Sequence, residues 1–183
     1  PLQVEYEEKY YAAGKIKGSK WIKRESRPSD EAILTGRVID RSIRPRFNHN
    51  VRNEIQVVAT VLTFDGVNDP DMPALFGASL ALMISDIPFD GPIAGVRVGR
   101  VDGKLVFNPT YSERISSDFD IVVAGTENRI NMIEAGAKIV PEDEMAGAIK
   151  AGFESFKDLI DFQKKIAGEV GKRRKSEIIA FSV

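Results

Sequence analysis

The segment GSKWIKRESRPSDEAILTGRVIDRSIRPRF, residues 18–47, carries the most concentrated charge pattern in this chain. Between Lys15 and Arg46 the chain has ten basic and four acidic residues, a net charge of +6, whereas all 183 residues together carry only −1. A nearly neutral chain is not a generally basic nucleic-acid binder. Any binding of a polyanion must therefore be confined to this basic segment.

The second half of the segment predicts a helix. Ser29 is a suitable N-cap residue, and residues 30–31 place two acids in the first turn, where the helix dipole favours negative charge. The helix should end near Ser42, because a proline follows three residues later and restricts the residue before it. Leu34 and Val38 are expected to face the core.

Three arginines share one side of this helix. Arg37, Arg41 and Arg44 follow the spacing i, i+4 and i+7, which places them on one stripe where they could bind consecutive phosphates. Asp40 offers another interpretation, because it is three residues from Arg37 and four from Arg44 and could hold them in a structural ion network. The spacing alone leaves both interpretations open.

The loop before the helix alternates basic side chains with Trp21. A basic groove with an exposed aromatic ring is typical of single-strand binding, since the charges follow the backbone and the ring stacks on a base. Trp21 could instead be buried beneath the loop, and residue types alone do not decide this. The loop bases are Lys15, Lys17, Lys20, Lys23, Arg24 and Arg27.

The N-terminal half of the chain contains further strand and helix signals. Residues 2–14 predict a strand that leads into a glycine-containing loop. Residues 53–64, NEIQVVATVLTF, are β-branched and almost continuously apolar, which predicts a central strand. Asp71 is a possible N-cap for a second helix, in which residues 73–85 are apolar on nearly all sides and should be buried.

The C-terminal half predicts a hairpin, a second strand pair and a helix. Residues 93–109 should form the hairpin around Asp102 and Gly103, and residues 118–140 the second strand pair, with a turn near Glu127. Apolar residues at positions 145, 149, 153, 156 and 160 predict one long amphipathic helix. The whole pattern indicates an α+β fold, a mixed sheet with packed helices.

Two acidic pairs are candidate metal ligands. Asp69 and Asp71 could bind a metal, but the residue types and their place in NDPDM favour a turn and an N-cap over a metal site. Asp118 and Asp120 are two residues apart in a strand, so they should share one face and could hold Mg²⁺, or simply begin a solvated strand. His49, the single histidine, has no evident nucleophile beside it in the sequence.

The composition excludes several other classes of protein. There is no cysteine, so disulfides, thiolate catalysis and cysteine-bound metals are excluded. No apolar run reaches the roughly 18 residues that span a membrane, and there is no signal peptide. We therefore expect a soluble, cytoplasmic protein without a membrane partner. A first residue other than methionine suggests that the sequence is a fragment.

The order of these segments resembles a known family. Residues 18–47, then NEIQVVATVL, FGASLALMISDIPFDGPIAGVRVG and DFDIVVAGTE, are similar to the first RNase PH-like core domain of bacterial polynucleotide phosphorylase. The resemblance implies an RNase PH-like fold, of the ribosomal protein S5 domain 2-like type, without its first strands. It implies that residues 1–140 form the core domain, 141–172 a long packing helix, and 173–183 a linker toward a helical domain.

The resemblance also implies a function. The family degrades RNA from 3′ to 5′ with inorganic phosphate as co-substrate, releases nucleoside diphosphates, requires Mg²⁺ and forms trimers. The matching positions imply that this chain grips single-stranded RNA in a channel as part of mRNA degradation. The implied RNA-binding residues are Trp21, Lys23, Arg24, Arg27, Arg37, Arg41 and Arg44.

The family's catalytic centre lies mainly in its second core domain, which this chain lacks. Carboxylates at Asp69 and Asp71 occupy the matching phosphate loop and would repel phosphate. Asp120 matches one metal-binding aspartate, but Arg114 and Val122 stand where the other aspartate and a lysine belong. The resemblance therefore implies that Asp120 is a degenerate remnant and that neither a catalytic set nor a Mg²⁺ site is complete here.

Three functional hypotheses follow. The first is an N-terminal core part of the phosphorolytic exoribonuclease, which guides RNA and packs against other subunits. The second is a stand-alone RNase PH-like nuclease with its own site near Asp120. The third is a non-catalytic RNA-binding or structural domain in which the basic helix forms an ion network.

Overall fold

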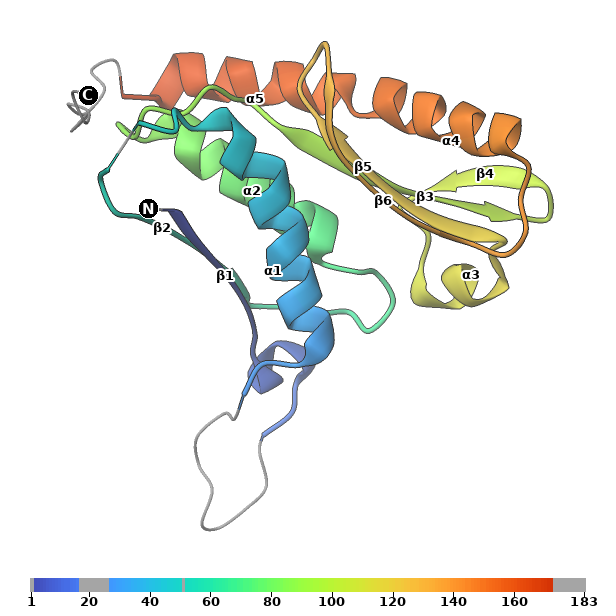
Figure 1. The fold of residues 1–183 in the computed structure, drawn as a ribbon. Coiled ribbons are helices and arrows are strands. Elements are labelled where there is room, and N and C mark those ends of the chain that lie inside the picture. The colour runs from blue at the N-terminus through green and yellow to red at the C-terminus, as the bar shows by residue number, and fades with distance from the viewer. Residues whose placement is uncertain (1, 17–26, 51, 173–183) are drawn as a thin grey trace.

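The structure is a computed structural model and describes residues 2–16, 27–50 and 52–172 (Figure 1). The elements in chain order are β1 (Leu2–Glu8), the 3-10 turn η1 (Tyr10–Ala13), α1 (Asp30–Ile43), the 3-10 turn η2 (Arg44–Arg46), β2 (Ile55–Val61), α2 (Asp71–Ile84), β3 (Ala94–Val101), β4 (Lys104–Phe107), α3 (Tyr111–Ser116), β5 (Phe119–Gly125), β6 (Ile130–Ala137), α4 (Glu142–Ser155) and α5 (Lys157–Val170).

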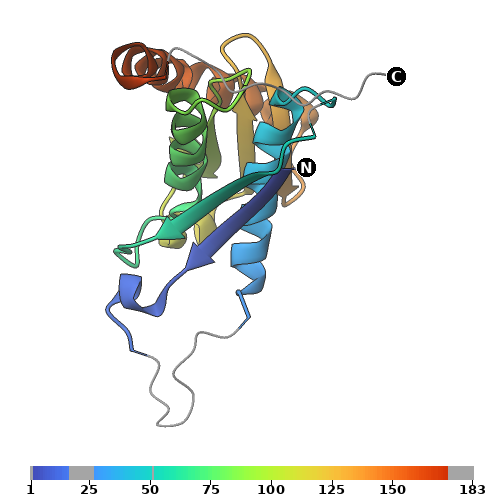
Figure 2. The ribbon, with the colours of Figure 1, turned by 90° about the vertical axis from the view of Figure 1, so that its left-hand side faces the viewer.

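These elements stack in layers. β1 and β2 form a parallel pair, and β4, β3, β5 and β6, in this order, form an antiparallel sheet. Figure 2 shows α1 and α2 between the two sheets. One buried cluster joins this helical layer to both sheets, and a second joins β3 and β5 to α4 and α5. The prediction of an α+β fold with helices packed on sheets is confirmed.

The strand predicted over residues 53–64 forms as β2, but it is not a central strand among the described residues. β2 pairs only with β1, in a register that places Ile55 opposite Leu2. Its side chains alternate between buried Val57 and exposed Val58. The prediction was wrong because β-branched residues favour extended backbone on either face of a sheet, so an apolar run does not by itself establish two-sided burial.

Helix α1 begins as predicted. The Ser29 hydroxyl accepts a hydrogen bond from the backbone N–H of Ala32 at 3.0 Å, which makes Ser29 the N-cap. Val38 is buried as expected, but Leu34 is 55% exposed, so its expected place in the core is wrong. The buried stripe includes Ala32, from which Leu34 is turned by about 200° around the helix axis.

Helix α2 differs from its prediction in two ways. Pro70 is the N-cap, and Asp71 is the first helical residue with its carboxylate directed into the protein. The helix is also not buried all round, because Pro73, Gly77 and Ala81 are exposed. This side of α2 and β2 border an open apolar groove of about 600 Å³.

Both predicted hairpins form in the four-stranded sheet. Asp102 and Gly103 adopt positive φ angles of 50° and 75°, which matches the type I′ turn favoured between antiparallel strands. β5 and β6 pair across the turn that was expected near Glu127. Along β5, Val122 and Ala124 face α1 and α2, whereas Ile121 and its alternate neighbours face α4.

The predicted long C-terminal helix is broken at Phe156, which separates α4 from α5. Each part packs on a different surface. α4 contacts β3 closely through Gly152, where an added Cβ would lie 2.9 Å from a methyl carbon of Val98. α5 contacts α2, and the rings of Phe76 and Phe162 stack with centroids 6.3 Å apart. The sequence did not indicate the break, because Phe156 is buried in the same core cluster as the apolar residues of α4 and α5 and so continues their periodicity.

Among the residues that the structure describes, no helix has the length and apolar character that a membrane crossing requires.

Candidate nucleic-acid interface

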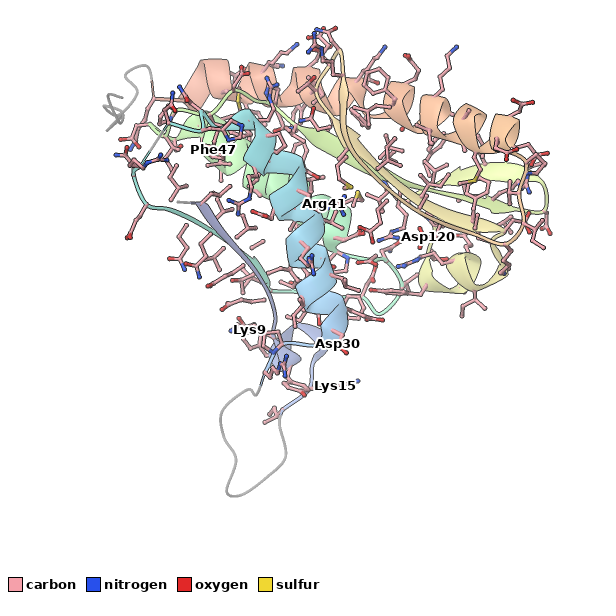
Figure 3. The ribbon with its side chains drawn as sticks, in the orientation of Figure 1. Lys9, Lys15, Asp30, Arg41, Phe47 and Asp120 are labelled. Atoms are coloured by element: carbon pink, nitrogen blue, oxygen red, sulfur yellow. The ribbon has the colours of Figure 1, made fainter. Side chains whose placement is uncertain are left out.

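Two arginines of α1 present guanidinium groups that are not paired with any acid in the described part of the chain. Arg37 and Arg41 are exposed, and neither forms an ion pair with another described residue. They are four residues apart and therefore lie on the same side of the helix. Figure 3 shows Arg41 along α1, with Asp30 at the start of the helix. This part of the arginine stripe can bind phosphates without first breaking an ion pair to a described residue.

Arg44 has a different environment. Its guanidinium donates to both carboxylate oxygens of Asp40, at 2.5 and 3.0 Å, and to the backbone carbonyl of Leu2 at 3.0 Å. The contact to Leu2 fixes the end of α1 against the start of β1. The ion-network interpretation therefore applies to Arg44 but not to Arg37, because among the described side chains Asp40 forms its ion pair with Arg44. RNA binding by Arg44 stays a prediction.

The loop residues Trp21, Lys23 and Arg24 lie outside the described residues. Arg27 is described and exposed, two residues before the N-cap of α1. Lys15 is exposed on the other side of the undescribed segment, and Figure 3 places it at the same end of the molecule as Asp30. The described bases at both ends of the loop therefore lie beside the start of α1.

A second group of charges surrounds Asp120. This carboxylate accepts two hydrogen bonds from Arg97, at 2.7 and 2.8 Å. It also forms an ion pair with Arg114, with 3.0 Å between nitrogen and oxygen. Arg97 also donates to Asp71 at 2.5 Å, and Arg114 donates to Asp69 at 2.6 Å. We call these five residues the aspartate–arginine cluster. It has three acids and two bases, and it joins β3, β5, α2, α3 and the loop before α2.

Burial determines the electrostatics of the aspartate–arginine cluster. The pKa of Asp71 is raised because the carboxyl is buried, although Arg97 acts in the opposite direction. Burial acts to lower the pKa of the Arg97 guanidinium. The negative charges and hydrogen bonds of Asp71 and Asp120 have a larger effect, so the pKa is raised overall. Burial, followed by the charge of Asp69, raises the pKa of Tyr111 to about 12.

The aspartate–arginine cluster does not fit a Mg²⁺ ion. Its three carboxylates already accept from guanidinium groups, and a divalent cation would be repelled by Arg97 and Arg114 at the same place. Among the described residues, no group of three or more acidic, histidine or cysteine side chains could hold a metal ion. The arrangement can support folding, because it fixes the sheet to α2 and α3.

The expected carboxylate pair on β5 is not formed. Asp118 precedes the strand and binds the Nε of Arg100 at 2.9 Å, on the side of the sheet that carries α4. Asp120 points to the opposite side, toward Arg97. The prediction that both share one face was wrong, because regular alternation begins only at Phe119, inside the strand.

Sequence reasoning missed Arg97, which contacts all three aspartates of the aspartate–arginine cluster. The available signal was a charged residue between two valines in the otherwise apolar start of AGVRVGRV. A charge at such a position requires a partner, because burying an unpaired ion is costly. The sequence did not indicate which acids would supply it.

Comparison with protein families gives two adjacent matches. The family model described as 3′ exoribonuclease family, domain 1, matches residues 1–88. The model described as 3′ exoribonuclease family, domain 2, matches residues 91–155. The boundary falls between α2 and β3, so the first match contains the parallel strand pair and the second contains the antiparallel sheet with α4.

Three curated proteins of similar sequence carry the same name. A polyribonucleotide nucleotidyltransferase of Anoxybacillus flavithermus is 56% identical over 183 residues, which are 100% of this chain and 26% of that protein. Those of Halalkalibacterium halodurans and Enterococcus faecalis are 56% and 54% identical, over 98% and 94% of this chain and 25% and 24% of their own lengths. The chain spans about a quarter of the length of these relatives.

Proposed function

The chain belongs to the 3′ exoribonuclease family, and on this basis we propose that it is the N-terminal core part of a phosphate-dependent 3′-to-5′ exoribonuclease, a polyribonucleotide nucleotidyltransferase. In the proposed reaction a phosphate oxygen bonds to the phosphorus of the last phosphodiester. The bond from that phosphorus to the 3′ oxygen of the preceding nucleotide breaks, and a nucleoside diphosphate leaves. Repetition of this step shortens the RNA from its 3′ end and degrades mRNA.

The proposed contribution of this chain is to hold single-stranded RNA. The carrying observation is that Arg37 and Arg41 are exposed without an ion-pair partner among the described residues, within a segment of net charge +6 in a chain of net charge −1. Such a patch attracts the phosphate backbone whatever the base sequence. The proposed RNA contacts extend to Arg27 and Arg44, and to Trp21 with its basic neighbours.

We propose that catalysis occurs outside these residues. The aspartate–arginine cluster offers carboxylates that would repel phosphate and guanidiniums that would repel Mg²⁺, which disfavours a stand-alone nuclease centred on Asp120. Mg²⁺ is proposed as a requirement of the intact enzyme. The alternative hypothesis, in which the basic helix forms a structural ion network, is supported only by Arg44, whose guanidinium is paired with Asp40.

A direct test incubates the 183-residue chain with end-labelled single-stranded RNA, inorganic phosphate and Mg²⁺. Bound RNA and released nucleoside diphosphate are followed in the same samples. We expect binding that weakens with salt and no diphosphate release. Diphosphate release that disappears in Asp120→Asn would instead establish a catalytic site in this chain and overturn the proposed division of roles.

We also propose that the protein acts as a homo-oligomer, a trimer as in the family, in the cytoplasm. The support for an oligomer is the open apolar groove between β2 and α2, together with Phe162 of α5, which is 52% exposed. Exposed apolar side chains gathered in a groove are typical of contact sites between proteins.

A further inference from the structure

An exposed leucine lies on the same side of α1 as Arg37 and Arg41. Leu34 is 55% exposed and belongs to neither buried cluster of the described residues. Arg37 follows it by three residues and Arg41 by seven, and side chains at these spacings share one helical face. Since successive residues are turned by about 100°, Leu34 and Arg41 differ in direction by only about 20°. We call these three residues the arginine–leucine face.

Charged side chains limit the arginine–leucine face at both ends. Asp30 is exposed one turn before Leu34, and its carboxylate repels phosphate. Arg44, beyond the other end, is paired with Asp40. Figure 3 labels Asp30 and Arg41 on α1, and Leu34 lies between them in the chain. The face therefore presents one apolar side chain and two cations within about two turns of helix.

The two kinds of side chain on this face suit different parts of a nucleotide. Guanidinium groups bind phosphate oxygens, which every phosphate polymer offers. A leucine adds nothing to that attraction, but it can bury apolar surface against a ribose or against the face of a base. A polymer that consists of phosphate alone has no such surface. A face with both kinds of side chain can therefore distinguish RNA from other polyanions.

We propose that Leu34 is a specificity-determining residue, which contacts a ribose or base of the single strand whose phosphates bind Arg37 and Arg41. This inference rests on the proposed RNA-binding function and adds to it a contact without charge. Contact with another protein subunit is the other way to cover an exposed leucine. The test below separates the two.

Binding of two polyanions to the 183-residue chain, measured by calorimetry, tests this proposal. Single-stranded RNA has phosphates, riboses and bases, whereas inorganic polyphosphate of similar length has phosphates only. Leu34→Ala should weaken RNA binding by about 5-fold and leave polyphosphate binding unchanged, because the lost contact is apolar. The slope of log affinity against log salt should not change, because no phosphate contact is removed. Alanine favours the helix at least as much as leucine, so α1 should remain intact.

Matched variants complete the experiment. Leu34→Met keeps an apolar side chain of similar size and should restore the RNA affinity. Arg37→Ala should weaken the binding of both polymers, because it removes a phosphate contact. Leu159→Ala is the control, because Leu159 is a helical leucine of α5 that is 40% exposed away from α1. Its affinities for both polymers should equal those of the unmodified chain.

The outcomes separate this inference from the proposed function. Weaker RNA binding with unchanged polyphosphate binding in Leu34→Ala supports the specificity role. Unchanged RNA binding overturns it and leaves the proposed function intact, and a lower mass of Leu34→Ala in light scattering would then assign Leu34 to a subunit contact. An equal loss for both polymers also overturns it, because Leu34 would then act only through the arginines. Failure of the unmodified chain to bind RNA overturns both. Thermal unfolding confirms that each variant is folded.

Discussion

Arg97 connects α2 and β5 through its side chain, which pairs with Asp71 on α2 and with Asp120 on β5. Its side chain is 14% exposed, and that of Asp71 only 4%. In such a pair the attraction between the ions is largely balanced by the loss of their hydration. The importance of Arg97 is therefore clearest when it is removed, because a buried carboxylate then loses its partner.

Arg97→Met should destabilise the fold by about 3 kcal/mol, since removing one partner of a buried ion pair typically costs this much or more. Denaturant unfolding measures the change in the free energy of unfolding. Arg114→Met is the control, because Arg114 is more exposed and its loss should cost clearly less. Equal, small losses in both variants would show that the aspartate–arginine cluster does not support the fold.

The raised pKa of Asp71 predicts a pH dependence. The folded state binds a proton at this carboxyl more tightly than the unfolded state, whose pKa is near 3.8. The stability contributed by that proton is complete below pH 3.8 and is lost as pH rises through the folded-state pKa. Relative to Asp71→Asn, the unmodified protein should thus gain stability as pH falls toward 3.8, as measured by denaturant unfolding across pH. A relative loss on acidification would contradict the raised pKa.

Arg37 and Arg41 of α1 should differ from Arg44, which follows the helix, in RNA titrations. Arg37→Ala and Arg41→Ala should each weaken binding and lower the salt slope by about 0.7, the value for one phosphate contact with a single strand. Arg44→Ala should change the slope less, because Arg44 is bound to Asp40 and to the carbonyl of Leu2. Equal slopes in all three variants would remove the distinction between free and paired arginines.

At the scale of elements, close packing between α4 and the sheet depends on one glycine. A Cβ at Gly152 would lie 2.9 Å from Val98 and 3.3 Å from Val96, and β-branched valines have little freedom to move. Gly147 lies on the same helix and has no atom within 4 Å of an added Cβ. The two glycines therefore separate packing from helix propensity.

Gly152→Ala should destabilise the protein by about 1 to 2 kcal/mol, because overpacking outweighs the gain in helix propensity. Gly147→Ala should stabilise it by up to about 1 kcal/mol, because only the propensity term applies. Thermal or denaturant unfolding measures both changes. A stabilising Gly152→Ala would mean that β3 and α4 can separate at little cost.

At the scale of the whole molecule, the groove between β2 and α2 leaves apolar surface open in the described part of the chain. If subunits of the proposed oligomer meet there, a charge in the groove should separate them without unfolding each subunit. Ala81 is exposed on α2 within the groove, and Ala146 is exposed on α4 away from it. These alanines provide a matched pair of sites.

Ala81→Glu should shift the protein toward monomer in light scattering or sedimentation, because the interface would bury an unpaired carboxylate. Ala146→Glu should leave the mass unchanged. Identical masses for both variants would place the subunit contact elsewhere. Circular dichroism of both variants verifies that the subunits remain folded.

The local features of this protein are determined by the sequence itself. Ser29 caps α1 because its hydroxyl reaches an N–H three residues away, and Asp102 and Gly103 turn the β3–β4 hairpin because both adopt positive φ angles. Each of these features needs only neighbouring residues. The basic character of residues 15–46 is equally a property of the sequence, and so is the family that the order of segments indicated.

Only the tertiary structure decided which charges are free and which are paired. Arg37 and Arg44 are equivalent in the helical pattern, but Arg44 also meets the carbonyl of Leu2, 42 residues away. Asp120 pairs with Arg97 across the sheet, at a sequence distance of 23 residues. Such partners are brought together by the packing of β-strands and helices, so side-chain spacing along one element cannot identify them.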